Sequence, residues 1–101
     1  MPAVCRVGDS LSTGHACAGS TTIAASNTDG TVKANGIEVI VVGAPTVAHP
    51  FPPVPICAPH VANLNAGSSS VFINGKAVGR VGDSADAGQM TSGSPNVFAG
   101  G

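Results

Sequence analysis

The chain has no tryptophan and no tyrosine, and only three of its 101 residues are phenylalanine. Nine residues are charged, and the formal net charge of −1 leaves no basic stripe to support nucleic-acid binding. The apolar residues are mainly Val, Ile and Ala, which suit thin β structure better than a thick aromatic core. We expect a single domain over residues 1–101, with a core small enough to need a metal, a disulfide or an oligomeric partner.

Long apolar runs are also missing. The longest, residues 37–48, is interrupted by Glu38 and Gly43 and falls short of the roughly 20 residues of a membrane helix. The N-terminus lacks the basic start and apolar run of a secretory signal peptide. We therefore expect a protein made in the cytoplasm, where three cysteines favour metal ligation over disulfides.

An internal repeat organises the sequence. Residues 6–10, Arg-Val-Gly-Asp-Ser, return unchanged as residues 80–84, and residues 41–45 are a degenerate third copy. A second pattern, Val-Phe-Ile-Asn-Gly-Lys-Ala-Val at 71–78, has an echo at 32–39 and a truncated one at 96–101. The chain therefore divides into three similar units near 3–36, 38–75 and 77–101.

The local chemistry of the repeats predicts hairpins and turns. Asn35-Gly36 and Asn74-Gly75 are strong two-residue hairpin signals, because both central positions of a type I′ turn need a positive φ. Asp9 and Asp83 each follow a turn glycine, where a carboxylate can accept backbone N–H groups. Helical periodicity is absent. We predict an all-β domain of short strands and hairpins with pseudo-threefold internal symmetry.

One proline-rich stretch, His49–His60, holds two of the three histidines and five of the eight prolines. Proline excludes a helix or a central strand, so a stiff exposed loop is expected. Corresponding loops of a three-unit fold should converge: His15 follows Gly8 by seven residues, and His49 follows Gly43 by six. The third unit has Gln89 at the matching place, and the middle loop adds Cys57 and His60 as donors. This pattern predicts a metal site.

The motifs at residues 6–9, 13–15, 67–83 and 93–98 together resemble the PAAR-repeat family over essentially the whole chain. The Pro-Ala-Ala-Arg sequence that names the family is degenerate here, at residues 3–6 and 77–80. The resemblance implies a small β-cone that caps the trimeric β-helical central spike of a contractile injection machine. Such machines include phage tails, R-type pyocins, extracellular injection systems and type VI secretion.

The same resemblance implies a zinc near the apex of the cone, held by three histidines and one cysteine. His15, His49 and His60 match the three histidines. The cysteine that the family often has near position 87 is replaced by Ala87. Cys57 is then the expected fourth ligand, with Cys17 as its rival, and iron can replace zinc; Cys5 precedes a strand and is expected in the core.

The five carboxylates are predicted to lie outside the metal-bearing loops: they are Asp9, Asp29, Glu38, Asp83 and Asp86. A catalytic zinc needs an open position and a base beside it, so the expected zinc is structural and the protein is not an enzyme.

The expected function is that of a membrane-piercing tip at the end of a phage-tail or injection-machine spike. The resemblance implies one copy per spike trimer and transient contact with a target cell envelope, with no nucleic acid and no small-molecule substrate. The alternatives are a small zinc-dependent hydrolase and a disulfide-stapled secreted binding module.

Overall fold

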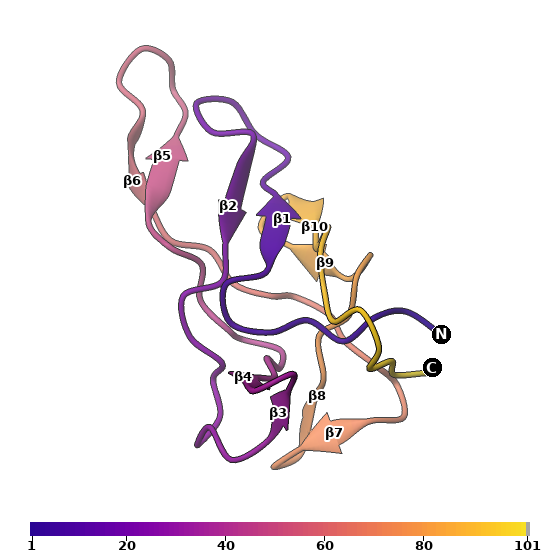
Figure 1. Cartoon of the computed structure of the whole chain (residues 1–101). Helices are drawn as coiled ribbons and strands as arrows, with labels where there is room; N and C mark the ends of the chain where they lie inside the picture. The colour runs from indigo at the N-terminus through magenta and orange to yellow at the C-terminus, as the bar shows by residue number, and fades with distance from the viewer. Residues whose placement is uncertain (101) are drawn as a thin grey trace.

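The computed structural model describes residues 1–100, which form an all-β domain without helix, with extents of 40 × 24 × 22 Å (Figure 1). Correspondingly, these residues contain no helical segment that could span a lipid bilayer. Five antiparallel hairpins carry the strands: β1 (Ser10–Ser12) with β2 (Ser20–Thr22), β3 (Lys33–Ala34) with β4 (Ile37–Glu38), β5 (His49–Phe51) with β6 (Ala58–His60), β7 (Phe72–Ile73) with β8 (Lys76–Ala77), and β9 (Ser84–Ala85) with β10 (Gly88–Gln89).

The two Asn-Gly hairpins are confirmed. Asn35 and Gly36 connect β3 to β4 with φ angles of 57° and 79°, and Asn74 and Gly75 connect β7 to β8 with 53° and 79°. Positive φ at both central residues is the requirement of a type I′ turn, which matches the twist of the flanking strands. Local sequence is therefore sufficient to determine both turns.

A closed ring of backbone hydrogen bonds joins the three units. The N–H of Cys5 donates to the carbonyl of Gly79 (2.9 Å), that of Gly79 to Ile40 (2.9 Å), and that of Ile40 to Cys5 (3.2 Å). Cys5 and Ile40 are fully buried. Each unit therefore pairs with both others around one centre, and the backbone pairing repeats three times.

A second set of contacts repeats in the same cyclic order. The bridges Leu11–Met90, Ile23–Thr46 and Leu64–Ala85 each join the strand after one turn to the return segment of another unit. The turn glycines have nearly equal φ angles of 89°, 94° and 91° at Gly8, Gly43 and Gly82. Side chains of both sets fill the main core, which consists of Cys5, Leu11, Ile23, Ile40, Ala44, Leu64, Ala85 and Met90.

This core contains no aromatic ring, because all three phenylalanines, Phe51, Phe72 and Phe98, are exposed. Burial of a Leu, Ile or Met side chain contributes about 1.5–3 kcal/mol, so eight small or medium residues give a modest total. The expectation of a small core is confirmed.

The turn role predicted for Asp9 and Asp83 is also confirmed. Asp9 accepts the backbone N–H of Arg6 (2.7 Å) and pairs with its guanidinium, with Nε–Oδ2 at 3.0 Å. Asp83 makes the same contacts with Arg80, at 2.8 Å and 3.0 Å. Both carboxylates hold their turns closed, and neither faces the candidate site described below.

The proline-rich stretch differs from the expected stiff exposed loop at its two ends, which pair as β5 and β6 with Pro50 opposite Pro59. This pairing is possible because the sheet has only two strands, so the missing proline N–H groups interrupt no central ladder. The register places His49 directly opposite His60. Residues 52–57 then form the loop that stands at one end of the molecule (Figure 1).

Candidate metal site

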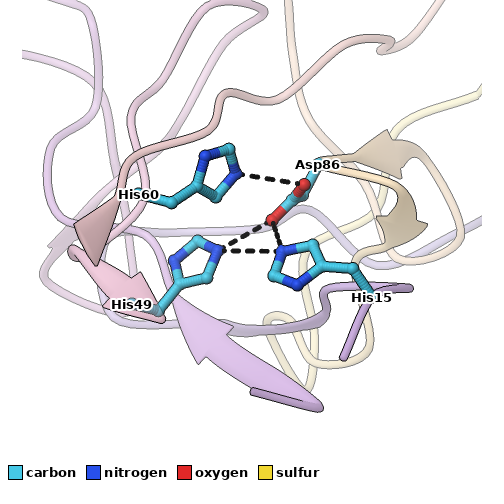
Figure 2. A group of neighbouring side chains, drawn as sticks. All are labelled: His15, His49, His60 and Asp86. Carbon is cyan, nitrogen blue, oxygen red and sulfur yellow. Dashed lines mark hydrogen bonds and ion pairs between the residues drawn. The ribbon is translucent and has the colours of Figure 1, made fainter. Parts of the chain in front are cut away.

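Four side chains from three separate hairpins meet at one point (Figure 2). His15 lies in the β1–β2 loop, His49 and His60 belong to β5 and β6, and Asp86 lies in the β9–β10 turn. One ligand atom from each lies within 4.8 Å of all the others. The convergence of His15, His49 and His60 agrees with the sequence-based expectation.

Asp86 occupies the position where a cysteine was expected. Its Oδ2 lies 2.8 Å from Nε2 of His15 and 2.8 Å from Nε2 of His49, and its Oδ1 lies 3.5 Å from Nε2 of His60. The Asp86 side chain is 6% exposed and that of His49 is 4% exposed. The carboxylate is thus enclosed by three imidazoles.

The backbone fixes Asp86 in a left-handed conformation, with a φ of 54°, between β9 and β10. Its N–H donates to the carbonyl of Asn63 (3.1 Å), and its carbonyl accepts from Nδ2 of Asn65 (2.9 Å). Aspartate tolerates this region better than most residues with a Cβ. The middle unit therefore holds the turn that presents the carboxylate.

The tautomers of two histidines follow from their backbone contacts. Nδ1 of His15 donates to the carbonyl of Ala16 (2.9 Å), and Nδ1 of His49 donates to the carbonyl of Val47 (2.9 Å). In the neutral imidazole, Nε2 then carries a lone pair. Both lone pairs face the Asp86 carboxylate and each other, with the two Nε2 atoms 3.3 Å apart. Such a group of acceptors needs a proton or a metal cation between its members: an imidazole with a proton on Nε2 hydrogen-bonds to the carboxylate, whereas one with a lone pair there can bind a metal.

A metal ion meets this need. Histidine ligands in metal sites typically donate their other ring N–H to a carbonyl, as both do here. A tetrahedral site with metal–nitrogen bonds of about 2.0–2.1 Å places its nitrogens about 3.3–3.4 Å apart, which matches the separation of the two Nε2 atoms. Three imidazoles and one carboxylate suit zinc, iron or other first-row divalent ions.

The pKa values of two members shift in opposite directions. Burial acts to raise the pKa of Asp86, but hydrogen bonds with His15, His49 and His60 outweigh it and the pKa is lowered. The pKa of His15 is raised, first by its hydrogen bond to the carbonyl of Ala16 and, against the effect of burial, by Asp86. Asp86 therefore remains an anionic ligand at neutral pH, while protons compete with a metal for His15.

The assignment of Cys57 as a ligand, and of Cys17 as its rival, differs from the structure. The two sulfurs are bonded to each other, so neither is a thiolate, and the prediction of free cysteines in this pair is wrong. The disulfide ties the β1–β2 loop, two residues beyond His15, to the β5–β6 loop. Cys5 is confirmed in the core, where burial, followed by Asp9 and Asp83, raises its pKa to about 12.

The expectation that every carboxylate lies outside the metal-bearing loops is wrong for Asp86. The third unit does supply a donor, Asp86, which stands three residues before Gln89 and one before Ala87. A signal was present, because the repeat predicts that the loop after Gly82 converges with those after Gly8 and Gly43. The donor positions expected in this loop, 87 and 89, both lie just after Asp86, so the repeat indicates the correct loop but not the correct residue.

Phe51 covers one side of the cluster. Its ring centroid lies 4.3 Å from that of His60 and 4.7 Å from that of His15. This ring reduces the access of water to two of the four candidate ligands.

The remaining carboxylates bond elsewhere: Asp9 to Arg6, Asp83 to Arg80, Glu38 to Ser26, and Asp29 to Thr31. Each of these four therefore has a structural partner away from the histidines.

In comparisons with known proteins, no family model and no curated protein matches this chain. The geometry of the cluster and the fold therefore carry the functional argument.

The close approach of Gly14 to the β9–β10 turn gives a test of the site. A Cβ at this residue would overlap the carbonyl oxygen of Ala87, and the φ of Gly14, 73°, disfavours other residues. We expect Gly14→Ala to move the His15 loop away from Asp86 and to weaken metal binding at least about tenfold. Metal titration followed by calorimetry measures this; Gly19→Ala, where a Cβ meets nothing within 4 Å, is the control. Unchanged affinity in Gly14→Ala would contradict the assembled site.

Proposed function

We propose that the chain is a PAAR-like spike tip: a pseudo-threefold β-cone that caps the trimeric central spike of a contractile injection machine. In this role it is not an enzyme and has no small-molecule or nucleic-acid ligand. It works at the end of a phage tail or related particle, after synthesis in the cytoplasm. The resemblance of its repeats to that family motivates the proposal.

The ring formed by Cys5, Ile40 and Gly79 is the observation that carries this proposal. Because the pairing repeats three times, one chain presents three similar faces to a partner with threefold symmetry. A monomer can then close the end of a trimer without leaving one of its three chains uncovered. This arrangement also protects the strand edges of the partner.

An apolar surface, here called the basal face, is available for that partner. Its exposed apolar residues are Val32, Val71, Phe72, Val97 and Phe98, which together with the exposed Lys33 line a hollow of about 310 Å³. The three valines hold equivalent places in the three units. The carbonyls of Val32, Val71 and Val97 accept the backbone N–H groups of Val39, Val78 and Val4, respectively. β3 and β7, next to this face, lie at the end opposite the β5–β6 loop (Figure 1). Two aromatic rings on such a surface are typical of an interface.

At the other end, His15, His49, His60 and Asp86 would hold one structural zinc, with iron as the alternative. The ion would tie three loops together where the core is small. All four positions of a tetrahedral ion are taken by protein, and the other four carboxylates bond elsewhere, which argues against a zinc hydrolase.

Co-expression with a trimeric β-helical spike protein from the same contractile system tests the cap. We expect a complex of one chain per trimer, measured by size exclusion with light scattering. Phe72 is 55% exposed, and Phe72→Asp is expected to weaken docking at least about tenfold, because it places a charge in an apolar interface. Ile37→Asp, at an exposed residue of β4 outside the hollow, is the matched control. A wild-type chain that remains unbound would refute the proposal.

A second candidate, a disulfide-stapled secreted binding module, is favoured by one observation, the Cys17–Cys57 bridge. Disulfides are common in small secreted domains with limited cores. A stoichiometric complex with a spike trimer distinguishes the spike tip from the secreted module, since a secreted binding module is not expected to form such a complex.

A further inference from the structure

The β5–β6 loop, residues 52–57, is apolar, exposed and remote from the basal face. Val54 is 66% exposed and Ile56 is 72% exposed, and Pro53 and Pro55 beside them are also exposed. The loop stands at one end of the molecule, beyond the β1–β2 loop, to which a disulfide attaches it (Figure 1). Neither the metal site nor the basal face accounts for these exposed side chains.

Formal charge is absent from this part of the chain. No Asp, Glu, Lys or Arg occurs between Glu38 and Lys76. Asp86, which contacts His49 and His60 of this hairpin, is itself enclosed, with 6% of its side chain exposed. The loop therefore offers no charged side chain to a polar or charged partner.

The backbone of the loop is also short of hydrogen-bond donors. Three of its six residues, Pro52, Pro53 and Pro55, have no N–H. Of the three N–H groups that remain, that of Cys57 donates to the carbonyl of Pro53 (3.0 Å). Unpaired backbone N–H and C=O groups both make irregular loops costly in an apolar medium. The three prolines lower the N–H part of that cost, while the six carbonyls of the loop remain.

We propose that the β5–β6 loop inserts into the boundary between headgroups and acyl chains of a phospholipid bilayer, with Val54 and Ile56 as its anchors. Interfacial helices bury their apolar face about 5–10 Å into this boundary, and the same hydrophobic contribution is available to an apolar loop. A protein partner fits the loop less well, because standard interfaces use roughly 20–30 residues per side. The inference deepens the proposed function by naming the envelope component that the tip contacts.

Absence of charge distinguishes this mode from electrostatic adsorption. Basic segments bind anionic lipids and are released by salt, whereas apolar insertion requires neither. We therefore expect the loop to bind zwitterionic phosphatidylcholine vesicles. Added phosphatidylglycerol, or an increase from 50 to 500 mM NaCl, should change the affinity less than about threefold.

The experiment is vesicle co-flotation with the purified chain as isolated. Ile56→Asp and, separately, Val54→Asp are expected to reduce vesicle binding at least about tenfold, because each replaces a buried apolar contact with a charge. Ile37→Asp is the matched control and should bind as the wild type does. Since Ile56 is 72% exposed, its substitution should leave the melting temperature nearly unchanged.

Several outcomes would overturn the inference. The first is that the chain binds neither kind of vesicle, which leaves a protein partner for the loop. The second is that it binds only anionic vesicles and is released at high salt. The third is that Ile56→Asp binds vesicles as well as the wild type does. The test needs no spike protein, so it is independent of the cap. If Ile56→Asp still docks on the spike but no longer binds vesicles, both proposals are supported. If the wild-type chain binds vesicles but does not dock on the spike, only the proposal of a spike cap is refuted.

Discussion

Removal of the metal is expected to unfold the domain or to bring it close to unfolding. Structural zinc contributes on the order of 10 kcal/mol in small domains, and the net stability of a domain is about 5–15 kcal/mol. The two core clusters contain fourteen small or medium residues and no aromatic ring, so the metal would be a major source of stability beside the Cys17–Cys57 bridge. Elemental analysis should find one metal ion per chain. Chelation should then lower the melting temperature by about 20 °C or more.

His60→Ala tests the same point by substitution. The His60 side chain is 27% exposed, so its removal leaves a smaller packing defect than removal of the buried His49. We expect the variant to lose the metal and most of its thermal stability, measured by elemental analysis and by calorimetry. Asp29→Asn, at an exposed carboxylate bonded to Thr31, is the control and should change stability by less than about 0.5 kcal/mol. A wild-type protein purified without metal, and insensitive to chelators, would refute the site.

Loss of the Cys17–Cys57 disulfide is expected to have the second-largest effect. The bridge closes a loop of 40 residues, for which the chain-entropy relation gives about 4 kcal/mol of stabilisation. It also links the loop that carries His15 to the loop between His49 and His60. The double variant Cys17→Ser, Cys57→Ser should therefore be less stable and bind metal less tightly. Denaturant unfolding and metal titration measure the two effects.

The control for the disulfide is Cys5. Its thiol is buried, donates to the carbonyl of Ser92 (3.2 Å) and has a pKa raised to about 12, so it should resist alkylation in the native protein. Mass spectrometry of the unreduced, denatured protein should find one free thiol per chain. Three free thiols would contradict the bridge, and a reductant that leaves wild-type stability unchanged would contradict its role.

The sequence predicts those parts of the structure that depend on neighbouring residues. Asn35-Gly36 and Asn74-Gly75 specify their turns through their own backbone preferences, and Asp9 and Asp83 accept backbone N–H groups within their turns. The convergence of His15, His49 and His60 could also be predicted, because the repeat relates the loops that carry them. These are local signals, or signals that recur along the chain.

The fourth ligand and the disulfide could not be predicted in the same way. Whether Cys57 faces His60 or Cys17 depends on how the β1–β2 and β5–β6 loops approach each other. Whether Asp86 faces the histidines depends on its left-handed turn and on its contacts with the middle unit. Both outcomes are decided by tertiary packing, which spacing along the chain does not encode.

The closed ring through Cys5, Ile40 and Gly79 has a consequence for the chemistry at the end of the molecule. In an assembly of three identical subunits, every donor on the axis would occur three times, which gives three or six equivalent ligands. Here the three units share one covalent chain, so their loops have diverged to one, two and one donors. Covalent linkage thus permits a set of four candidate ligands of mixed chemistry at a point of near-threefold symmetry.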